Sequence, residues 1–176
     1  KLILDPDLDT YYVMDALLLK EPEIIDELGN LGALVEQIAA SDRGPDAAAT
    51  LAASAALLQF QADGLQTDLE TAFEETPRLN KNENLEPALQ PLLNQALAAT
   101  KAVVDQTNVN VDPAAHGAAV REAIDAHNAL WLELFEQEDA MLETRKDGDL
   151  GRRRFALGLP LVAAACGSSP EPYYYT

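Results

Sequence analysis

The sequence predicts an all-α fold, an antiparallel four-helix bundle followed by an irregular C-terminal tail. Three observations support this prediction. Apolar residues recur at alternating steps of three and four along four long segments, which is the spacing of one helical face. Short stretches with proline, glycine or aspartate separate the segments, so successive helices are expected to fold back on one another. Alanine and leucine dominate, and no alternating strand pattern competes with the helices.

The first predicted helix runs from about Asp9 to Ala40. Pro22 interrupts it, and because an internal proline removes a backbone hydrogen bond, we expect a kink or a short restart there. A turn with Gly44 and Pro45 then separates it from the next helix. The apolar face of the first helix contains Met14, Leu17, Ile24, Leu28, Leu31, Val35 and Ile38.

Three further helices are expected at about 46–75, 85–107 and 113–146, the last one capped by Asp112. Their apolar faces are expected to share one interior with the first helix. On the second helix this face contains Leu51, Ala55, Leu58, Ala62, Leu65, Leu69 and Ala72. On the third it contains Leu85, Leu89, Leu92, Ala96, Ala99 and Val103, and on the fourth Val120, Ile124, His127, Trp131, Leu134, Glu138 and Met141.

The composition restricts the function classes. The chain has 176 residues, enough for one domain with a real core. Lys and Arg total 12 against 30 Asp and Glu, and the formal net charge is −18. Such an acidic surface repels phosphates and anionic lipids, so nucleic-acid partners are not expected. Cys166 is the single cysteine, which excludes a disulfide within the chain.

The last part of the chain breaks the pattern, so we divide the sequence into a bundle (1–146) and a tail (147–176). Two glycines, Gly148 and Gly151, are expected to end the last helix. Three arginines and a 12-residue apolar run follow, too short for a bilayer span. Residues 152–176 resemble a lipoprotein signal peptide with Cys166 as the lipidated residue. The alternatives are a truncated membrane helix and a segment that is foreign to this protein.

The acidic opening stretch contains the candidate site residues. Asp7 and Asp9 are suited to cap the first helix, because carboxylates accept its free N–H groups. Together with Asp5 they resemble the start of a calcium-binding EF-hand loop, but Thr10 stands where that loop needs glycine and Ala16 where it needs glutamate. The Asp-x-Asp pattern of haloacid-dehalogenase-like enzymes fails too, since its threonine is out of step. We predict no metal and no cofactor.

Other polar and aromatic residues also favour structural roles. Tyr11 and Tyr12 point to adjacent helix faces, and the sequence favours aromatic packing over ligand stacking for both. His127 lies on the apolar face with only His116 as a distant second histidine, so we expect a hydrogen-bonded core residue. No Ser–His–Asp or Cys–His set and no glycine-rich phosphate loop is present. We therefore expect no enzymatic activity.

A resemblance to a known class of proteins adds to this picture. Residues 2–16, continued by 21–22 and 28–34, resemble a segment of the extracytoplasmic sensor regions of bacterial transmembrane receptors. These receptors include methyl-accepting chemotaxis proteins and related histidine kinases and diguanylate cyclases. Residues 127–132 and 142–145 resemble the last helix before the second membrane span of such receptors. After Arg145 the resemblance ends, because no long membrane helix follows.

The resemblance implies a periplasmic sensory module of an inner-membrane receptor, homodimeric in its parent and recognising a small molecule. The membrane would be reached only through flanking segments. Asp5, Asp7, Asp9, Tyr11 and Tyr12 would then form a structural corner or the edge of a ligand site. The alternative function is a non-catalytic helical scaffold or interaction bundle of the cell envelope, which could be associated with a lipoprotein. A stabilising ligand would distinguish the two, since only a sensor needs one.

Overall fold

Helices account for nearly all of the chain. A computed structural model describes the backbone of residues 7–41 and 45–165 and the side chains of 7–41 and 46–146. The elements are α1 (Leu8–Asp15), η1 (Ala16–Lys20, a π-helical turn), α2 (Glu21–Ala40), α3 (Pro45–Glu75), α4 (Leu85–Gln106) and α5 (Pro113–Ala165). No strand occurs in these ranges, which confirms the all-α prediction.

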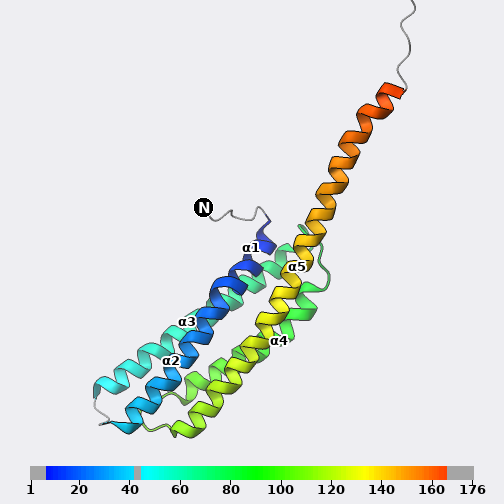
Figure 1. Cartoon of the computed structure of the whole chain (residues 1–176). Coiled ribbons are helices and arrows are strands. Elements are labelled where there is room, and N and C mark those ends of the chain that lie inside the picture. Colours follow the sequence, from blue (N-terminus) through cyan, green and yellow to red (C-terminus); the bar gives the residue numbers. More distant parts are fainter. Residues whose placement is uncertain (1–6, 42–44, 166–176) are drawn as a thin grey trace, which may run out of the picture. The chain divides into compact units, whose positions relative to one another are not determined.

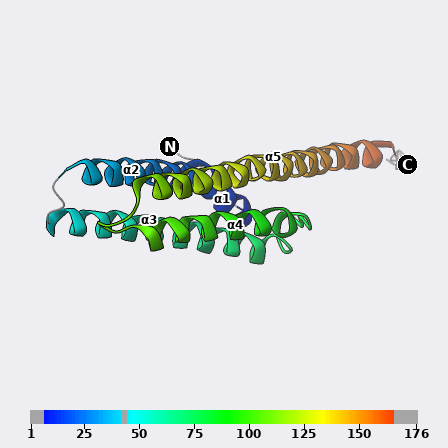
Figure 2. The same cartoon turned by 90° about the horizontal axis from the view of Figure 1, so that it is seen from below.

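The chain divides into two units, Lys1–Met141 and Leu142–Thr176. The packing described below lies within the first unit. There, α3 packs against α1, η1, α2 and α4. Side-chain hydrogen bonds join α5 to α2 and to α4. Figure 2 shows the resulting two layers, with α2 and the first part of α5 in one layer and α3 and α4 in the other (Figures 1 and 2).

Each helix contributes one apolar face to a common core. On α3 the face is the predicted one, and all seven of its residues are buried. On α2 the predicted aliphatic residues from Ile24 to Ile38 are buried as well. Leucines fill most of this interior, and burying each side chain removes roughly 1.5–3 kcal/mol of unfavourable hydration. The largest fully buried side chains are Ile24, Leu28, Leu31, Leu51, Leu58, Leu65, Leu69, Leu85, Leu89, Leu93, Leu130 and Leu134.

On α4 and α5 most of the predicted core residues are buried, and two positions on each helix differ from the prediction. Leu93 and Thr100 are buried where Leu92 and Ala99 were expected. On α5, Ala123 and Leu130 are buried where Ile124 and Trp131 were expected. These differences arise because a threonine or histidine can be buried when its polar atoms have hydrogen-bond partners in the core. A ranking by side-chain hydrophobicity overlooks this possibility.

The predicted end of the last helix is wrong. The sequence predicts a helix end near Lys146 and an irregular tail, whereas α5 continues through 147–165 without interruption. A glycine ends a helix by adopting a left-handed backbone conformation, and no glycine of the described chain has a positive φ. Gly148 and Gly151 therefore remain helical, and the following arginines, alanines and leucines favour continuation. Cys166 lies outside the described residues.

No helix in the described part of the chain combines the length and the apolar character that a membrane span requires.

Asp112 caps α5 as predicted, since its Oδ1 accepts the backbone N–H of Ala114 at 3.2 Å. At the other end of the chain, Asp7 occupies the N-cap position of α1 with an extended backbone (φ −97°, ψ 119°). Its side chain makes no capping hydrogen bond.

Candidate functional site

The acidic opening stretch forms a buried corner around Asp9. The Asp9 carboxylate is fully buried and accepts the backbone N–H of Thr10 at 2.9 Å, a donor of the first turn of α1. Its Oδ1 also accepts the side-chain amide of Asn80 at 2.8 Å, and Thr10 Oγ1 accepts from the same amide at 2.9 Å. Asn80 lies between α3 and α4, so these bonds attach the start of α1 to that loop.

The other predicted corner residues lie around Asp9 or outside the described chain. Tyr11 and Tyr12 are half-buried, and their rings meet edge to face with centroids 5.3 Å apart. Tyr12 packs against the hydrophobic core. Asp5 lies outside the described residues. The geometry at Asp9 is that of a structural joint, and whether a ligand also binds there stays a prediction.

A second polar site lies at the junction of η1 and α2, which the chemistry of Pro22 explains. In the π-helical turn the N–H of Glu21 bonds the carbonyl of Ala16, five residues earlier. The next carbonyl in this register, that of Leu17, would need a donor from Pro22, which has no N–H. The indole Nε1 of Trp131 donates to this carbonyl instead, at 2.8 Å. The restart predicted at Pro22 is thus a π-turn, with Pro22 in the first turn of α2.

The Trp131 bond also explains where this side chain lies. An indole that must reach a backbone carbonyl of a neighbouring helix stays at the margin of the core, and Trp131 is 39% exposed. The predicted core position of Trp131 is therefore wrong. Leu130, one residue earlier, is fully buried in its place.

Next to this turn, three polar side chains from three helices form a chain of hydrogen bonds in the core. The Oε2 atom of Glu21 on α2 lies 2.8 Å from Nδ1 of His127 on α5. The Nε2 atom of the same histidine lies 2.8 Å from Oγ1 of Thr100 on α4. Glu21 and His127 are fully buried and Thr100 is 1% exposed. The prediction of His127 as a hydrogen-bonded core residue is confirmed.

Burial is the main influence on the ionisation of Glu21 in this hydrogen-bonded network. It raises the pKa of Glu21, while the hydrogen bond and the charge of His127 act in the opposite direction. The second carboxyl oxygen of Glu21, Oε1, is buried without a hydrogen-bond partner among the described residues. The order carboxyl–imidazole–hydroxyl is that of a hydrolase triad. Here the hydroxyl is closed off from solvent, so this arrangement has no access for a substrate.

A cluster of three charged residues, the Lys20 cluster, lies on the other side of the same turn. Lys20 Nζ of η1 lies 4.0 Å from Asp15 Oδ2 of α1 and 4.0 Å from Asp68 Oδ2 of α3. The Asp15 carboxyl is a direct neighbour of Asp68 and can accept a hydrogen bond from its protonated form. Burial and this neighbouring carboxyl raise the pKa of Asp68 to about 6, against the charge of Lys20.

The two polar groups and the Trp131 bond together define the junction site, residues 17–21 and their partners. Leu17, Lys20 and Glu21 of the junction site make polar contacts to α1, α3 and α5, and His127 extends the contacts to α4. Each neighbouring helix is thereby tied to a stretch of five residues. π-turns inside helices are frequently found at functional sites.

His116, at the start of α5, makes a separate buried contact. Thr107 donates its hydroxyl proton to the carbonyl of Val103 at 2.8 Å, so its oxygen accepts from His116 Nε2 at 3.0 Å. His116 Nδ1 is buried without a hydrogen-bond partner within the described ranges. Burial lowers the pKa of His116, and the ring is held neutral.

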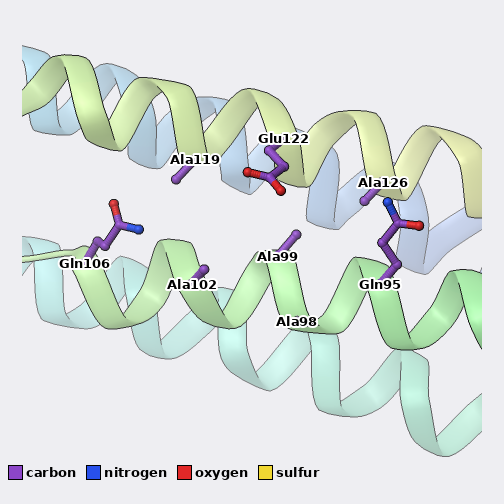
Figure 3. A pocket seen from close by; sticks show the side chains of 8 residues that line it. All are labelled: Gln95, Ala98, Ala99, Ala102, Gln106, Ala119, Glu122 and Ala126. Carbon is purple, nitrogen blue, oxygen red and sulfur yellow. The ribbon is translucent and has the colours of Figure 1, made fainter.

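A shallow groove of about 280 Å³ runs between α4 and α5 (Figure 3). Its walls are mainly alanines, and the carboxylate of Glu122 lies in the middle between the two helices. The amides of Gln95 and Gln106 lie towards its two ends. All three polar side chains are exposed to solvent, so the groove offers no buried polar group that would select a ligand.

The described residues contain no group of three or more His, Cys, Asp or Glu side chains arranged to hold a metal ion. Comparison with known proteins adds no assignment: no family model matches the chain, and no curated protein or solved structure matches it significantly.

Sequence reasoning located part of this chemistry. It identified His127 and Pro22 and placed Asp9 at the start of a helix. It overlooked Thr100, because alanine at 99 fitted the apolar spacing, and it gave Glu21 no role beyond the resemblance. A signal was present, since Glu21 occupies an apolar-face position between Leu17 and Ile24. A charged residue on such a face requires a partner.

Proposed function

We propose that the first unit is an antiparallel four-helix bundle that acts as the sensory input module of a bacterial transmembrane receptor. The contact pairs Asp9–Asn80, Lys20–Asp68 and Glu27–Ser54 support the antiparallel course, because residue numbers fall along α3 as they rise along α1 and α2. The resemblance of the opening stretch to receptor sensor regions supports the class. The periplasmic location and a homodimeric parent belong to the same proposal.

The observation that carries the proposal is the chain Glu21–His127–Thr100 in the bundle core. Three buried polar groups are a costly way to fill an interior that leucine could fill. Such a network is satisfied only in one relative position of α2, α4 and α5, and any shift breaks a bond to a desolvated group. Packing of this kind has discrete alternatives rather than a continuous range, which is what a signalling element needs.

A stimulus would act by displacing one helix relative to this network. The joint at Asp9 lies on α1, close in sequence to the π-turn, and α1 continues into the turn. A ligand bound near Tyr11 or Tyr12 would therefore pull on the segment that ends at Glu21. The response would pass to α5 through His127 and Trp131.

The proposal is tested with a thermal-shift screen of the full chain against amino acids, organic acids and divalent cations. A specific ligand must raise the melting temperature, because it binds the folded state alone. We expect a hit whose shift is lost in Asp9→Asn and kept in Asp63→Asn, an exposed aspartate of α3. Shifts are compared with each variant's own baseline. A screen without any hit contradicts the sensory role.

One observation favours the second candidate, a scaffold that binds another protein. Leu132 and Phe135 are 70% and 64% exposed on the outer face of α5, beside the half-exposed Trp131. Exposed large apolar side chains in a cluster are typical of interaction surfaces. An empty ligand screen would favour this function.

A further inference from the structure

The Lys20 cluster contains a bond that depends on a proton. Asp15 on α1 and Asp68 on α3 each place a carboxyl oxygen 4.0 Å from Lys20 Nζ, and a carboxyl-to-carboxyl hydrogen bond with Asp15 favours the protonated form of Asp68. Two ionised carboxylates offer acceptors only, so one of the pair must be protonated for this bond to exist. Lys20 is 4.0 Å from both and thus beyond hydrogen-bond distance. The side chains of Asp15 and Asp68 are 18% and 15% exposed, so water solvates their charged forms only in part.

We propose that the Lys20 cluster is an acid-responsive latch: a proton shared by Asp15 and Asp68 fastens the π-turn to α3, and its loss at neutral pH loosens that contact. Without the proton, two negative charges face each other across a single distant ammonium group. The repulsion then acts between α1, which carries Asp15, and α3, which carries Asp68, and η1 directly follows α1 in the chain. These are the segments that join the Asp9 corner to Glu21. This inference stands on the cluster geometry and is independent of the sensory role.

The sign of the effect follows from linkage. The pKa of Asp68 is about 6 in the folded protein against an ordinary value of 3.8, so between these values the folded state holds a proton that the unfolded state has released. This contribution to stability is present at pH 4–5 and is lost as the pH rises through 6. The raised pKa of Glu21 acts in the same direction. The lowered pKa of His116 acts in the opposite direction, and its contribution is lost as the pH falls below 6.5.

The charged groups that act on Asp68 within the described bundle are Asp15 from α1 and Lys20 from η1. The nearby acid of α2, Glu21, bonds His127 of α5 instead, and α4 contributes the neutral Thr100 to that same chain. A variant at Asp68 therefore changes the latch and leaves the titration of Glu21 and His116 in place. The difference between variants, rather than the pH profile of one protein, isolates the latch.

The test measures the folding equilibrium constant of the full chain by urea unfolding at pH 5 and pH 8. We expect the folding constant at pH 5 divided by that at pH 8 to be about tenfold smaller in Asp68→Asn than in the unchanged protein, because asparagine cannot take up the proton. The matched control Asp63→Asn removes the same charge from an exposed position of α3 and should leave the ratio unchanged. Asp15→Asn removes the partner carboxyl and should reduce the ratio in the same direction by a smaller factor, because burial still raises the pKa of Asp68.

Amide hydrogen exchange at residues 16–21 supplies the local readout. Protection there, corrected for intrinsic exchange, should fall from pH 5 to pH 8 in the unchanged protein and fall less in Asp68→Asn. If Asp68→Asn does not fold, Asp15→Asn carries both measurements. The latch is overturned if both variants keep the pH ratio of the unchanged protein. It is also overturned if protection at residues 16–21 shows the same pH dependence in these variants.

Discussion

His127 shows how a histidine becomes part of a hydrophobic interior. Each ring nitrogen has one partner at 2.8 Å, a carboxyl oxygen on one side and a hydroxyl on the other. Nδ1 shares one bond with the Glu21 carboxyl and Nε2 shares the other with the Thr100 hydroxyl. Removing one partner leaves a buried nitrogen unsatisfied, and that loss exceeds the value of the bond itself.

Thr100→Val tests this argument at one residue. Valine has the shape of threonine without the hydroxyl, so the change should destabilise the protein by about 1–3 kcal/mol, through the unsatisfied His127 Nε2. The measurement is the free energy of unfolding in urea at pH 7. Thr67→Val is the matched control, because Thr67 is exposed and bonds only the backbone of its own helix. It should stay within about 0.5 kcal/mol of the unchanged protein, and equal effects of the two variants would refute the argument.

At the scale of the helix, the position of the apolar face is the informative quantity. α4 turns Leu93 fully inward and leaves Leu92 half-buried, although the sequence spacing favours Leu92. The buried Thr100 lies seven residues after Leu93, two turns along the same face. The bond of Thr100 to His127 and the burial of Leu93 therefore require the same orientation of α4.

Leu93→Ala and Leu92→Ala measure this orientation. Leu93→Ala should lower the free energy of unfolding by about 2–5 kcal/mol, since it removes a fully buried side chain and leaves a cavity. Leu92→Ala should cost less than half of that value. Thermal and urea unfolding of the two variants under identical conditions make the comparison. The reverse order would show that the apolar spacing alone positions the helix.

The helices themselves follow from local sequence. Apolar spacing, Pro45 and Asp112 located α3 and α5 within one residue of their starts, and the seven core positions of α3 were all correct. Pro22 signalled the interruption of the first helix. Its form, a π-turn completed by Trp131, depends on a contact between residues 114 positions apart. Spacing along one segment contains no information about such a partner.

At the scale of the whole molecule, the net charge is −18, and the largely apolar core of the described bundle contains several buried polar side chains. The junction site ties its neighbouring helices to residues 17–21, and the Asp9 corner ties α1 to the loop before α4. The sequence alone indicates some residues of both sites, such as Asp9 and His127. Their assembly was not, because Asn80, Thr100 and Asp68 are unremarkable in the sequence and gain meaning only as partners.

The length of α5 is a further property that local reasoning misjudged. Gly148 and Gly151 suggest a helix end in the sequence, yet a glycine only permits such an end, and the chain continues helically to Ala165. Within the first unit, α5 contributes His127, Trp131 and the contact of Gln137 with Asn82. The same helix therefore meets both the junction site and the α3–α4 loop.

The central claim is that the core network couples α4 to the π-turn through His127. Native-state amide exchange of residues 16–21 in Thr100→Val tests it, because Thr100 bonds His127 and its variant changes no side chain of the turn. We predict that protection of these amides falls by about tenfold or more relative to Thr67→Val, in line with a local cost near 1.4 kcal/mol. Protection at residues 16–21 equal to that in Thr67→Val would contradict the coupling, if Thr100→Val still lowers the free energy of global unfolding by about 1–3 kcal/mol.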